Sequence, residues 1–171
     1  MAEPVSRRRP AVEVAVALGS NVPHGTHGRP RQVLRAAVAA LRAAGLEVER
    51  LSPIVETAPL GPSKRRYANA ALKGRWRGGA LELLALLKRL ERAFGRRRGR
   101  RWGARVLDLD LIALGDAQLR LKGLEVPHPR LQQRDFVLGP LETVWPGWRH
   151  PRTGLSVRQM RARLKKPRAV D

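Results

Sequence analysis

The residues best suited to chemistry lie in one stretch near the middle of the chain, residues 101–110, with the sequence RWGARVLDLD. Asp108 and Asp110 are two residues apart in a segment that alternates like a β-strand, so their carboxylates leave the same face of a sheet. Mg²⁺ is often held by one or two carboxylates together with substrate phosphates, and the arginines just upstream suit those phosphates. The pattern predicts a metal and a phosphate group at one site. The alternative is a solvated strand face, or a carboxylate pair neutralised by arginine.

A glycine-punctuated arginine loop, residues 95–103, comes directly before this strand. Its five arginines between Gly95 and Trp102 repel one another unless anions lie among them, and a triphosphate would supply those anions. We expect the glycines to let the loop move and Trp102 to anchor it when it closes. The alternative is a solvated basic loop whose tryptophan packs onto the core.

A ring-binding pattern lies earlier in the chain. The turn-rich loop of residues 56–62 (ETAPLGP) leads to Tyr67 and Asn69, which share one face of a predicted strand. A ring beside an amide suits a flat heterocycle, which stacks on the first and hydrogen-bonds to the second. Phe136 could supply a second ring. Alternatively, Tyr67 and Phe136 are ordinary core residues and His128 is a turn residue.

Glu91 stands out on the predicted helix of residues 80–94. The leucines of this helix form one apolar arc, and Glu91 falls at the margin of that arc. A carboxylate beside a core needs a partner. The alternative is an ordinary boundary glutamate that pairs with Lys88 or an arginine.

The elements that position these residues follow the order βαββαβ, which predicts an α+β, ferredoxin-like sandwich with an antiparallel sheet. A small hairpin at 118–126, irregular proline-rich turns and C-terminal helical structure come after it, including a basic helix at about 155–165. We expect residues 1–10 to be a disordered basic leader, residues 11–166 to form a single domain, and 167–171 to be a tail. The strands and helices are predicted, in order, at 12–18, 31–44, 46–54, 67–77, 80–94 and 104–114.

Composition narrows the class of protein. The 171 residues carry a formal net charge of +21, and they contain no cysteine, which excludes disulfides and thiolate metal sites. No apolar run reaches the length of a membrane span, and the run at 11–18 is too short for an export signal. The charge permits a nucleic-acid binder, but the arginines are spread along the chain and aromatic residues make up only 4%. We therefore expect a cytoplasmic protein that contacts neither membrane nor nucleic acid; the sequence leaves its oligomeric state open.

Taken in order, the short segments of this chain resemble the 6-hydroxymethyl-7,8-dihydropterin pyrophosphokinase family of folate biosynthesis. The resemblance covers about residues 12–160, with several departures. Ala104 stands where the family usually has proline, the loop after Gly61 and the arginine loop are slightly short, Lys88 replaces a neutral nucleotide contact of some members, and the basic tails at both ends are extra. The matching segments are Ala17–Asn21, Glu56–Pro62, Tyr67–Ala71, Leu90–Arg96, Arg101–Asp110, Pro127–Arg130 and Arg134–Leu138.

The resemblance implies a fold, a reaction and a set of site residues. The fold is the ferredoxin-like sandwich, and the reaction transfers diphosphate from ATP to the hydroxymethyl group of the pterin, releasing AMP. Asp108 and Asp110 would bind two Mg²⁺ ions and act in catalysis with Arg96 and Arg105. The pterin pocket would comprise Thr57, Ala58, Leu60, Tyr67, Asn69 and Phe136, with Trp102 closing over it. The ATP site would comprise Glu91, Arg96, Arg98, Trp102, Arg105, His128 and Arg134. There are two competing interpretations. One is a basic nucleic-acid or ribosome-associated protein, and the other is an inactive homologue that binds ATP.

Overall fold

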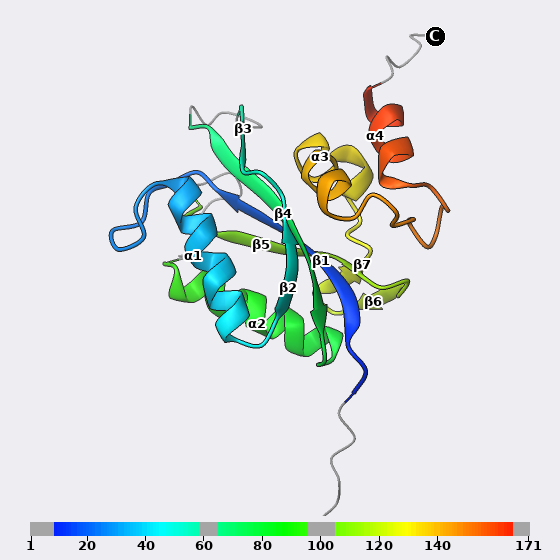
Figure 1. Ribbon diagram of the computed structural model, residues 1–171, viewed down its shortest axis with the longest axis horizontal. Coiled ribbons are helices and arrows are strands. Elements are labelled where there is room, and N and C mark those ends of the chain that lie inside the picture. The colour runs from blue at the N-terminus through cyan, green and yellow to red at the C-terminus, as the bar shows by residue number, and fades with distance from the viewer. Residues whose placement is uncertain (1–8, 59–64, 96–104, 166–171) are drawn as a thin grey trace, which may run out of the picture.

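A computed structural model gives the fold, and it describes residues 9–58, 65–95 and 105–165. The central sheet has five strands in the order β2-β4-β1-β5, and β3 also pairs with β4 (Figure 1). All these pairings are antiparallel, which confirms the predicted α+β sandwich. The sheet strands are β1 (Val12–Ser20), β2 (Glu47–Leu51), β3 (Val55–Thr57), β4 (Tyr67–Trp76) and β5 (Asp108–Leu114).

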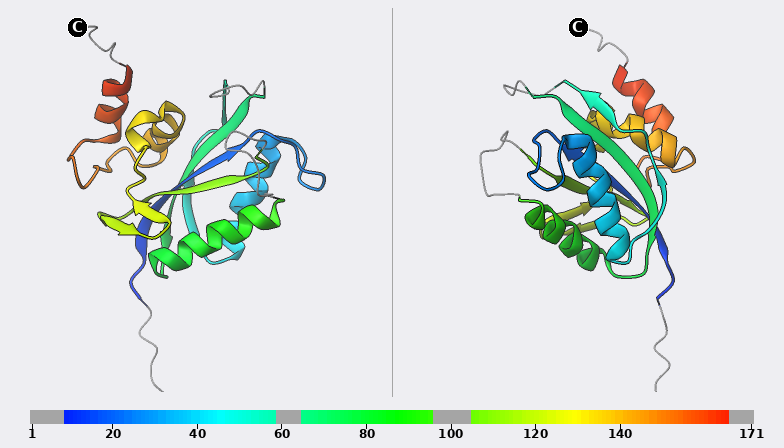
Figure 2. Two further views of the ribbon diagram at one scale, coloured as in Figure 1. Left: turned by 180° about the vertical axis from the view of Figure 1, so that it is seen from behind. Right: turned by 60° about the vertical axis from the view of Figure 1, so that its left-hand side comes forward.

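Helices α1 (Pro30–Ala43) and α2 (Ala80–Ala93) cover one face of the sheet (Figure 2). Proline at the first position of α1 needs no N–H partner, and Gly45 ends the helix with a φ of 96°. Glu82 caps the start of α2 by accepting a hydrogen bond from the N–H of Gly79. Alternate residues of the central strands, such as Val16 and Leu18 of β1, pack against these helices in the larger core.

Among the residues that the structure describes, helices cover the opposite face of the sheet at one end only. Helices α3 (Asp135–Val144) and α4 (Val157–Lys165) pack there with Ala15 and Ile112 of the sheet in a second core. The hairpin of β6 (Leu119–Leu121) and β7 (Leu124–Val126) and a 3-10 turn, η1 (Leu131–Gln133), connect β5 to α3. This arrangement leaves the other end of that face available for a site.

Two sequence predictions about elements were wrong. Residues 135–144 form helix α3, in a region where irregular proline-rich turns were expected. The predicted strand 46–54 is too long, because β2 ends at Leu51 and the next residue, Ser52, accepts a hydrogen bond from the N–H of Ala71 through its hydroxyl; strand β3 (Val55–Thr57), which follows, was not predicted. The predicted hairpin and C-terminal helix are present. The predicted leader and tail lie almost wholly outside the described residues.

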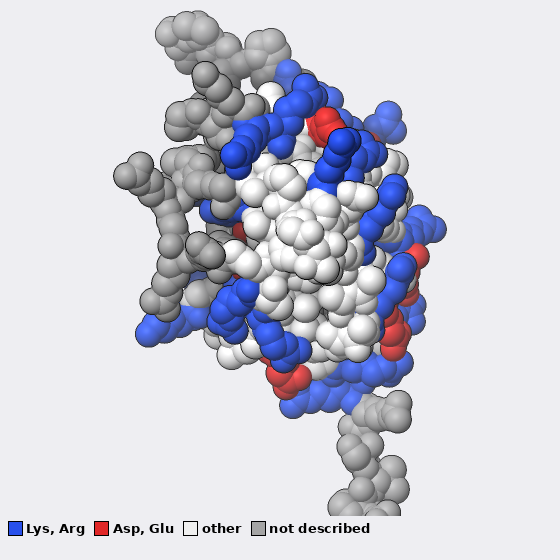
Figure 3. All heavy atoms as spheres, turned by 90° about the vertical axis from the view of Figure 1, so that its left-hand side faces the viewer, with Lys and Arg blue, Asp and Glu red and all other residues white. Residues whose placement is uncertain are grey.

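Basic side chains on the left-hand face of Figure 1 surround a large uncharged area (Figure 3). Acidic residues are few on this face, as the composition requires. Among the described residues, no helix is both long enough and apolar enough to cross a membrane.

Candidate active site

Two rows of residues across the sheet build the floor of the candidate site. Gly19 of β1 lies between Asn69 of β4 and Asp108 of β5, and the next row places Ala17 opposite Asp110. Gly19 and Ala17 carry little or no side chain, so the polar groups at either side stand above a nearly flat floor. The two aspartates therefore share one face of the sheet.

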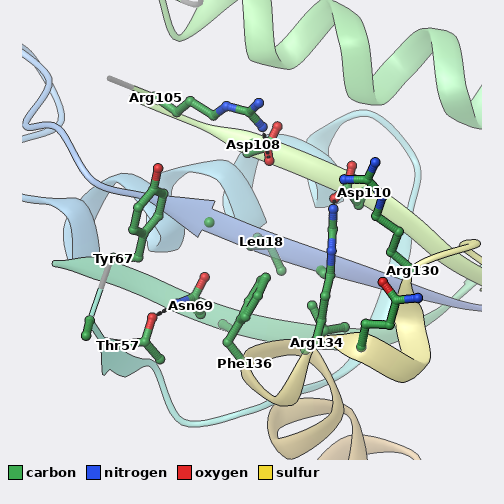
Figure 4. A pocket seen from close by; sticks show the side chains of 16 residues that line it. Leu18, Thr57, Tyr67, Asn69, Arg105, Asp108, Asp110, Arg130, Arg134 and Phe136 are labelled. Atoms are coloured by element: carbon green, nitrogen blue, oxygen red, sulfur yellow. Dashed lines mark hydrogen bonds and ion pairs between the residues drawn. The ribbon is translucent and has the colours of Figure 1, made fainter. Parts of the chain in front are cut away.

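A cavity of about 410 Å³ lies above this floor. The β3–β4 side contributes a ring and an amide, β5 contributes the carboxylates, and the segment leading into α3 closes the far side (Figure 4). Residues of the predicted site that line the cavity are Thr57, Ala58, Tyr67, Asn69, Arg105, Asp108, Asp110, Arg134 and Phe136. The structure thus gathers nine positions that are spread over 80 residues of sequence.

Each aspartate is paired with an arginine. Arg105 Nη1 lies 2.6 Å from Asp108 Oδ2, and Arg134 Nη1 lies 3.1 Å from Asp110 Oδ2. Burial opposes the charge of Arg105, but Asp108 outweighs that effect and the pKa of Arg105 is raised. Arginines therefore neutralise both aspartates, as the alternative interpretation of this carboxylate pair expected.

The two aspartates suit Mg²⁺ if water and substrate phosphates supply its remaining ligands. Among the described residues, no group of three or more His, Cys, Asp or Glu side chains could hold a metal ion. Mg²⁺ is suited to this situation because it keeps several waters and takes further ligands from substrate phosphates. Two carboxylates at the wall of an open cavity are the ligands that such a site requires. That Asp108 and Asp110 bind metal stays a prediction.

Asn21 positions Arg105, which the sequence did not indicate. Its side-chain oxygen accepts a hydrogen bond from the Arg105 N–H at 2.7 Å, and its own N–H donates to the Arg105 carbonyl at 3.0 Å. Asn21 is buried, so this clamp is shielded from water. The end of β1 thereby fixes the backbone from which the Arg105 guanidinium reaches Asp108.

Glu91 holds the backbone between the two aspartates. Its side chain is only 1% exposed, and Oε1 accepts a hydrogen bond from the N–H of Leu109 at 2.8 Å. Lys88 Nζ lies 3.1 Å from both carboxylate oxygens, as the alternative interpretation of this glutamate expected. Glu91 therefore joins α2 to the strand that carries both acids.

His128 faces Asp110 from a turn that is fastened to β5. The N–H of His128 donates to the carbonyl of Ile112, and its Nδ1 accepts from the N–H of Arg130 at 3.1 Å. The ring proton of the neutral form therefore sits on Nε2, which lies 3.9 Å from Asp110 Oδ2. Burial lowers the pKa of His128 despite the opposing effect of Asp110, and the nearby arginines lower it further.

The predicted ring pair lines the cavity, and Phe136 also packs against the second core. Tyr67 and Phe136 are both partly buried, and the guanidinium of Arg134 lies 5.8 Å from the centre of the Phe136 ring. Asn69 is buried, and its amide nitrogen donates to the Thr57 hydroxyl at 2.7 Å. The Asn69 carbonyl oxygen lies above Gly19, where a Cβ atom would come within 3.4 Å of it. A flat polar heterocycle fits these surroundings.

A second cavity of about 390 Å³ follows the outer edge of β5, between α2 and the β6–β7 hairpin. Asp110 lines both cavities, and His128 is the other predicted site residue that lines this second one. Sequence reasoning missed the rest of this groove, because the hairpin side chains that form it carry no recognisable motif. Its lining is Leu84, Lys88, Leu109, Asp110, Leu111, Arg120, Leu121, Gly123, Leu124, Glu125, His128 and Pro129.

Four predicted site residues lie outside the described residues: Leu60, Arg96, Arg98 and Trp102. Their proposed roles, and the arginine loop as a whole, stay predictions.

The fold and the paired cavities define a protein of the α+β sandwich class with a phosphate-compatible acidic centre. A model of the family described as 7,8-dihydro-6-hydroxymethylpterin-pyrophosphokinase (HPPK) matches residues 15–146. The chain therefore belongs to the HPPK family, and the predicted family and its pterin pyrophosphokinase activity in folate biosynthesis are confirmed.

Individual relatives agree with this assignment. The chain is 41% identical over 146 residues to the 2-amino-4-hydroxy-6-hydroxymethyldihydropteridine pyrophosphokinase of Synechocystis sp., covering 85% of this chain and 72% of the relative. The Pseudomonas aeruginosa enzyme of the same name is 39% identical, with 81% and 83% of the two chains covered. A mitochondrial folate synthesis bifunctional protein of Arabidopsis thaliana is 41% identical, but only 23% of its length is covered.

Solved structures support the fold. The Plasmodium falciparum HPPK-DHPS structure matches with a TM-score of 0.69, covering 92% of this chain and 45% of that chain at 12% identity. The chain thus spans less than half of that bifunctional protein.

Proposed function

We propose that this chain uses ATP and two Mg²⁺ ions to place a diphosphate on the hydroxymethyl group of 6-hydroxymethyl-7,8-dihydropterin. The hydroxymethyl oxygen forms a bond to the β-phosphorus of ATP, the bond from that phosphorus to the oxygen bridging it to the α-phosphate breaks, and AMP leaves. The observation that supports this assignment best is the pair of cavities that meet at Asp110. The first cavity carries a ring and an amide that suit a flat heterocycle, and the second cavity would take the nucleoside.

The residues of the first cavity would orient the pterin. Its ring would lie between Tyr67 and Phe136, and Asn69 and Thr57 would supply the in-plane hydrogen bonds. The hydroxymethyl group would then face the aspartates on β5. Alignment of this kind supplies much of the rate enhancement in reactions between two bound substrates.

The charged residues would handle the phosphates. Asp108 and Asp110 would hold the Mg²⁺ ions, which when bound neutralise phosphate charge and lower the pKa of the attacking hydroxyl. Arg105 and Arg134 would turn from the carboxylates to phosphate oxygens, because guanidinium groups bind phosphate in a bidentate manner. Neutral His128 would donate its Nε2 proton to a phosphate oxygen of the nucleotide.

The test measures AMP formation from ATP with and without the hydroxymethyl-dihydropterin. We expect AMP and pterin diphosphate in equal amounts, and no turnover when Mg²⁺ is removed by a chelator. Asp110→Asn should lower turnover by about three orders of magnitude while the fold is kept. Asp116→Asn, an exposed position outside both cavities, is the matched control and should match wild type.

Two outcomes would overturn the proposal. AMP formation that does not need the pterin would mean a different acceptor, and wild-type turnover in Asp110→Asn would remove the metal assignment. A cytoplasmic location is part of the proposal and would be checked by fractionating cells that express the full chain.

A further inference from the structure

The turn of residues 128–130 stands between the two cavities. His128 and Pro129 line the cavity along the edge of β5, whereas Arg130 lines the cavity above the sheet. Asp110 lines both. A molecule that reaches from one cavity into the other must therefore pass Asp110 and the Arg130 side of this turn.

Among the described residues, the guanidinium of Arg130 is not paired with a carboxylate. In the ranges that the structure describes, its guanidinium makes no ion pair or hydrogen bond, whereas Arg105 and Arg134 each hold an aspartate. The side chain is exposed, yet Figure 4 shows it reaching from its turn toward Asp110, beside Arg134. The backbone of Arg130 is held in place, because its N–H donates a hydrogen bond to His128 Nδ1.

The local charge favours an anion at this place. Three guanidinium groups of the first cavity, from Arg105, Arg130 and Arg134, face the two carboxylates of Asp108 and Asp110. One positive charge is therefore left over, and it is the one without a partner. Arginine presents a planar fork of N–H donors that matches two phosphate oxygens, and such charge-assisted bonds are about twice as strong as neutral ones.

We propose that Arg130 is a further phosphate-binding residue, which holds the polyphosphate of the nucleotide where it crosses from one cavity to the other. This inference rests on the proposed function for the identity of the nucleotide. It assigns to Arg130 the affinity for the phosphate chain, and no part in binding the pterin ring or the nucleoside.

The experiment compares Arg130→Ala and Arg130→Lys with Arg158→Ala. Arg158 is exposed on α4, lines neither cavity and makes no side-chain hydrogen bond or ion pair among the described residues. Its alanine variant also removes one arginine, so it has the same net charge as Arg130→Ala. Calorimetry would measure the dissociation constants of an α,β-methylene analogue of ATP with Mg²⁺, of inorganic tripolyphosphate, of adenosine and of the pterin alone.

We expect Arg130→Ala to weaken binding of the analogue and of tripolyphosphate by about ten- to a hundredfold, the usual range for one charge-assisted hydrogen bond. Arg130→Lys should lie between this variant and wild type, because lysine keeps the charge and loses the fork. Binding of adenosine and of the pterin should change by less than about twofold in every variant. Arg158→Ala should match wild type throughout.

Equal affinities of Arg130→Ala and Arg158→Ala for the analogue and for tripolyphosphate would overturn the inference. Equal losses for adenosine and for the analogue would overturn it too, because they would indicate a general disturbance of the groove. Circular dichroism and thermal midpoints confirm folding, and Arg130→Gln replaces the alanine variant if that variant is unstable. If wild type makes no AMP with the pterin, the proposed function fails, whereas the tripolyphosphate comparison still decides the role of Arg130.

Discussion

Replacing Glu91 tests whether one buried carboxylate holds in place the strand that carries Asp108 and Asp110. Its Oε1 accepts the N–H of Leu109, the residue between the two aspartates, at 2.8 Å. Alanine at position 91 leaves that buried N–H without this acceptor, while glutamine keeps an oxygen in the same place. The two variants therefore separate the hydrogen bond from the charge.

The structure gives the size of the effect. A buried donor that loses its acceptor costs about 1–3 kcal/mol, and the buried methylene removed with the carboxylate adds about 0.8 kcal/mol. The partner Lys88 is 40% exposed, so its ion pair adds less than about 1 kcal/mol. Glu91→Ala should therefore lower the free energy of unfolding by about 2–4 kcal/mol, and Glu91→Gln by about 1 kcal/mol.

Urea unfolding followed by circular dichroism measures these differences, and for a chain of this size they correspond to a loss of about 5–15 °C in thermal midpoint for Glu91→Ala. Lys88→Ala is the control, and it should cost less than about 1 kcal/mol because Glu91 keeps its bond to Leu109. A Lys88→Ala variant as unstable as Glu91→Ala would show that the ion pair matters more than the strand contact. A Glu91→Ala variant as stable as wild type would refute the reasoning altogether.

Two further predictions concern the ring cavity and the pH dependence of stability. Asn69→Ala should weaken pterin binding by about ten- to a hundredfold in a fluorescence titration, whereas binding of the ATP analogue should stay the same; an unchanged pterin affinity would remove Asn69 from the site. Burial, aided by the charge of Arg152, lowers the pKa of His150 from 6.5, so the unfolded chain takes up this proton more readily than the folded one. The free energy of unfolding should therefore decrease as the pH falls below about 6.5, and His150→Asn should show a smaller decrease in urea unfolding at pH 7.5 and 5.5; equal decreases would contradict this assignment.

The sequence predicted the sheet and the helices that cover its first face, because those elements carry regular periodicity. Strand β1 alternates between its two cores, and α1 ends at a glycine with positive φ. Helix α3 was not predicted, because Pro140 lies inside it and proline in a helix interior destabilises the helix. Its buried residues, among them Leu138 and Leu141, form the second core, and that burial outweighs the cost of the proline.

The candidate site was predictable only where the chemistry lies in short motifs. Asp108, Asp110 and the Tyr67–Asn69 pair could be found from strand spacing, because residues two apart share a face. The clamp of Asn21 on Arg105 joins positions that are 84 apart in sequence, and no local pattern reveals such a contact. The approach of Arg130 to Asp110 depends in the same way on a turn whose path is set by its bonds to β5.

The ion pairs of the site explain how two carboxylates can stand together beside a core. Asp108 and Asp110 would repel each other, and each instead lies within 3.1 Å of a guanidinium nitrogen. Under the proposed function the same arginines would move to the phosphates as Mg²⁺ reaches the carboxylates, so every charge has a partner in both states. Mg²⁺ alone would displace the arginines without offering them an anion, whereas Mg²⁺ arriving with a polyphosphate supplies both exchanges together. Under the proposed function, metal binding and nucleotide binding would therefore favour each other, since each would provide the partner that the other removes.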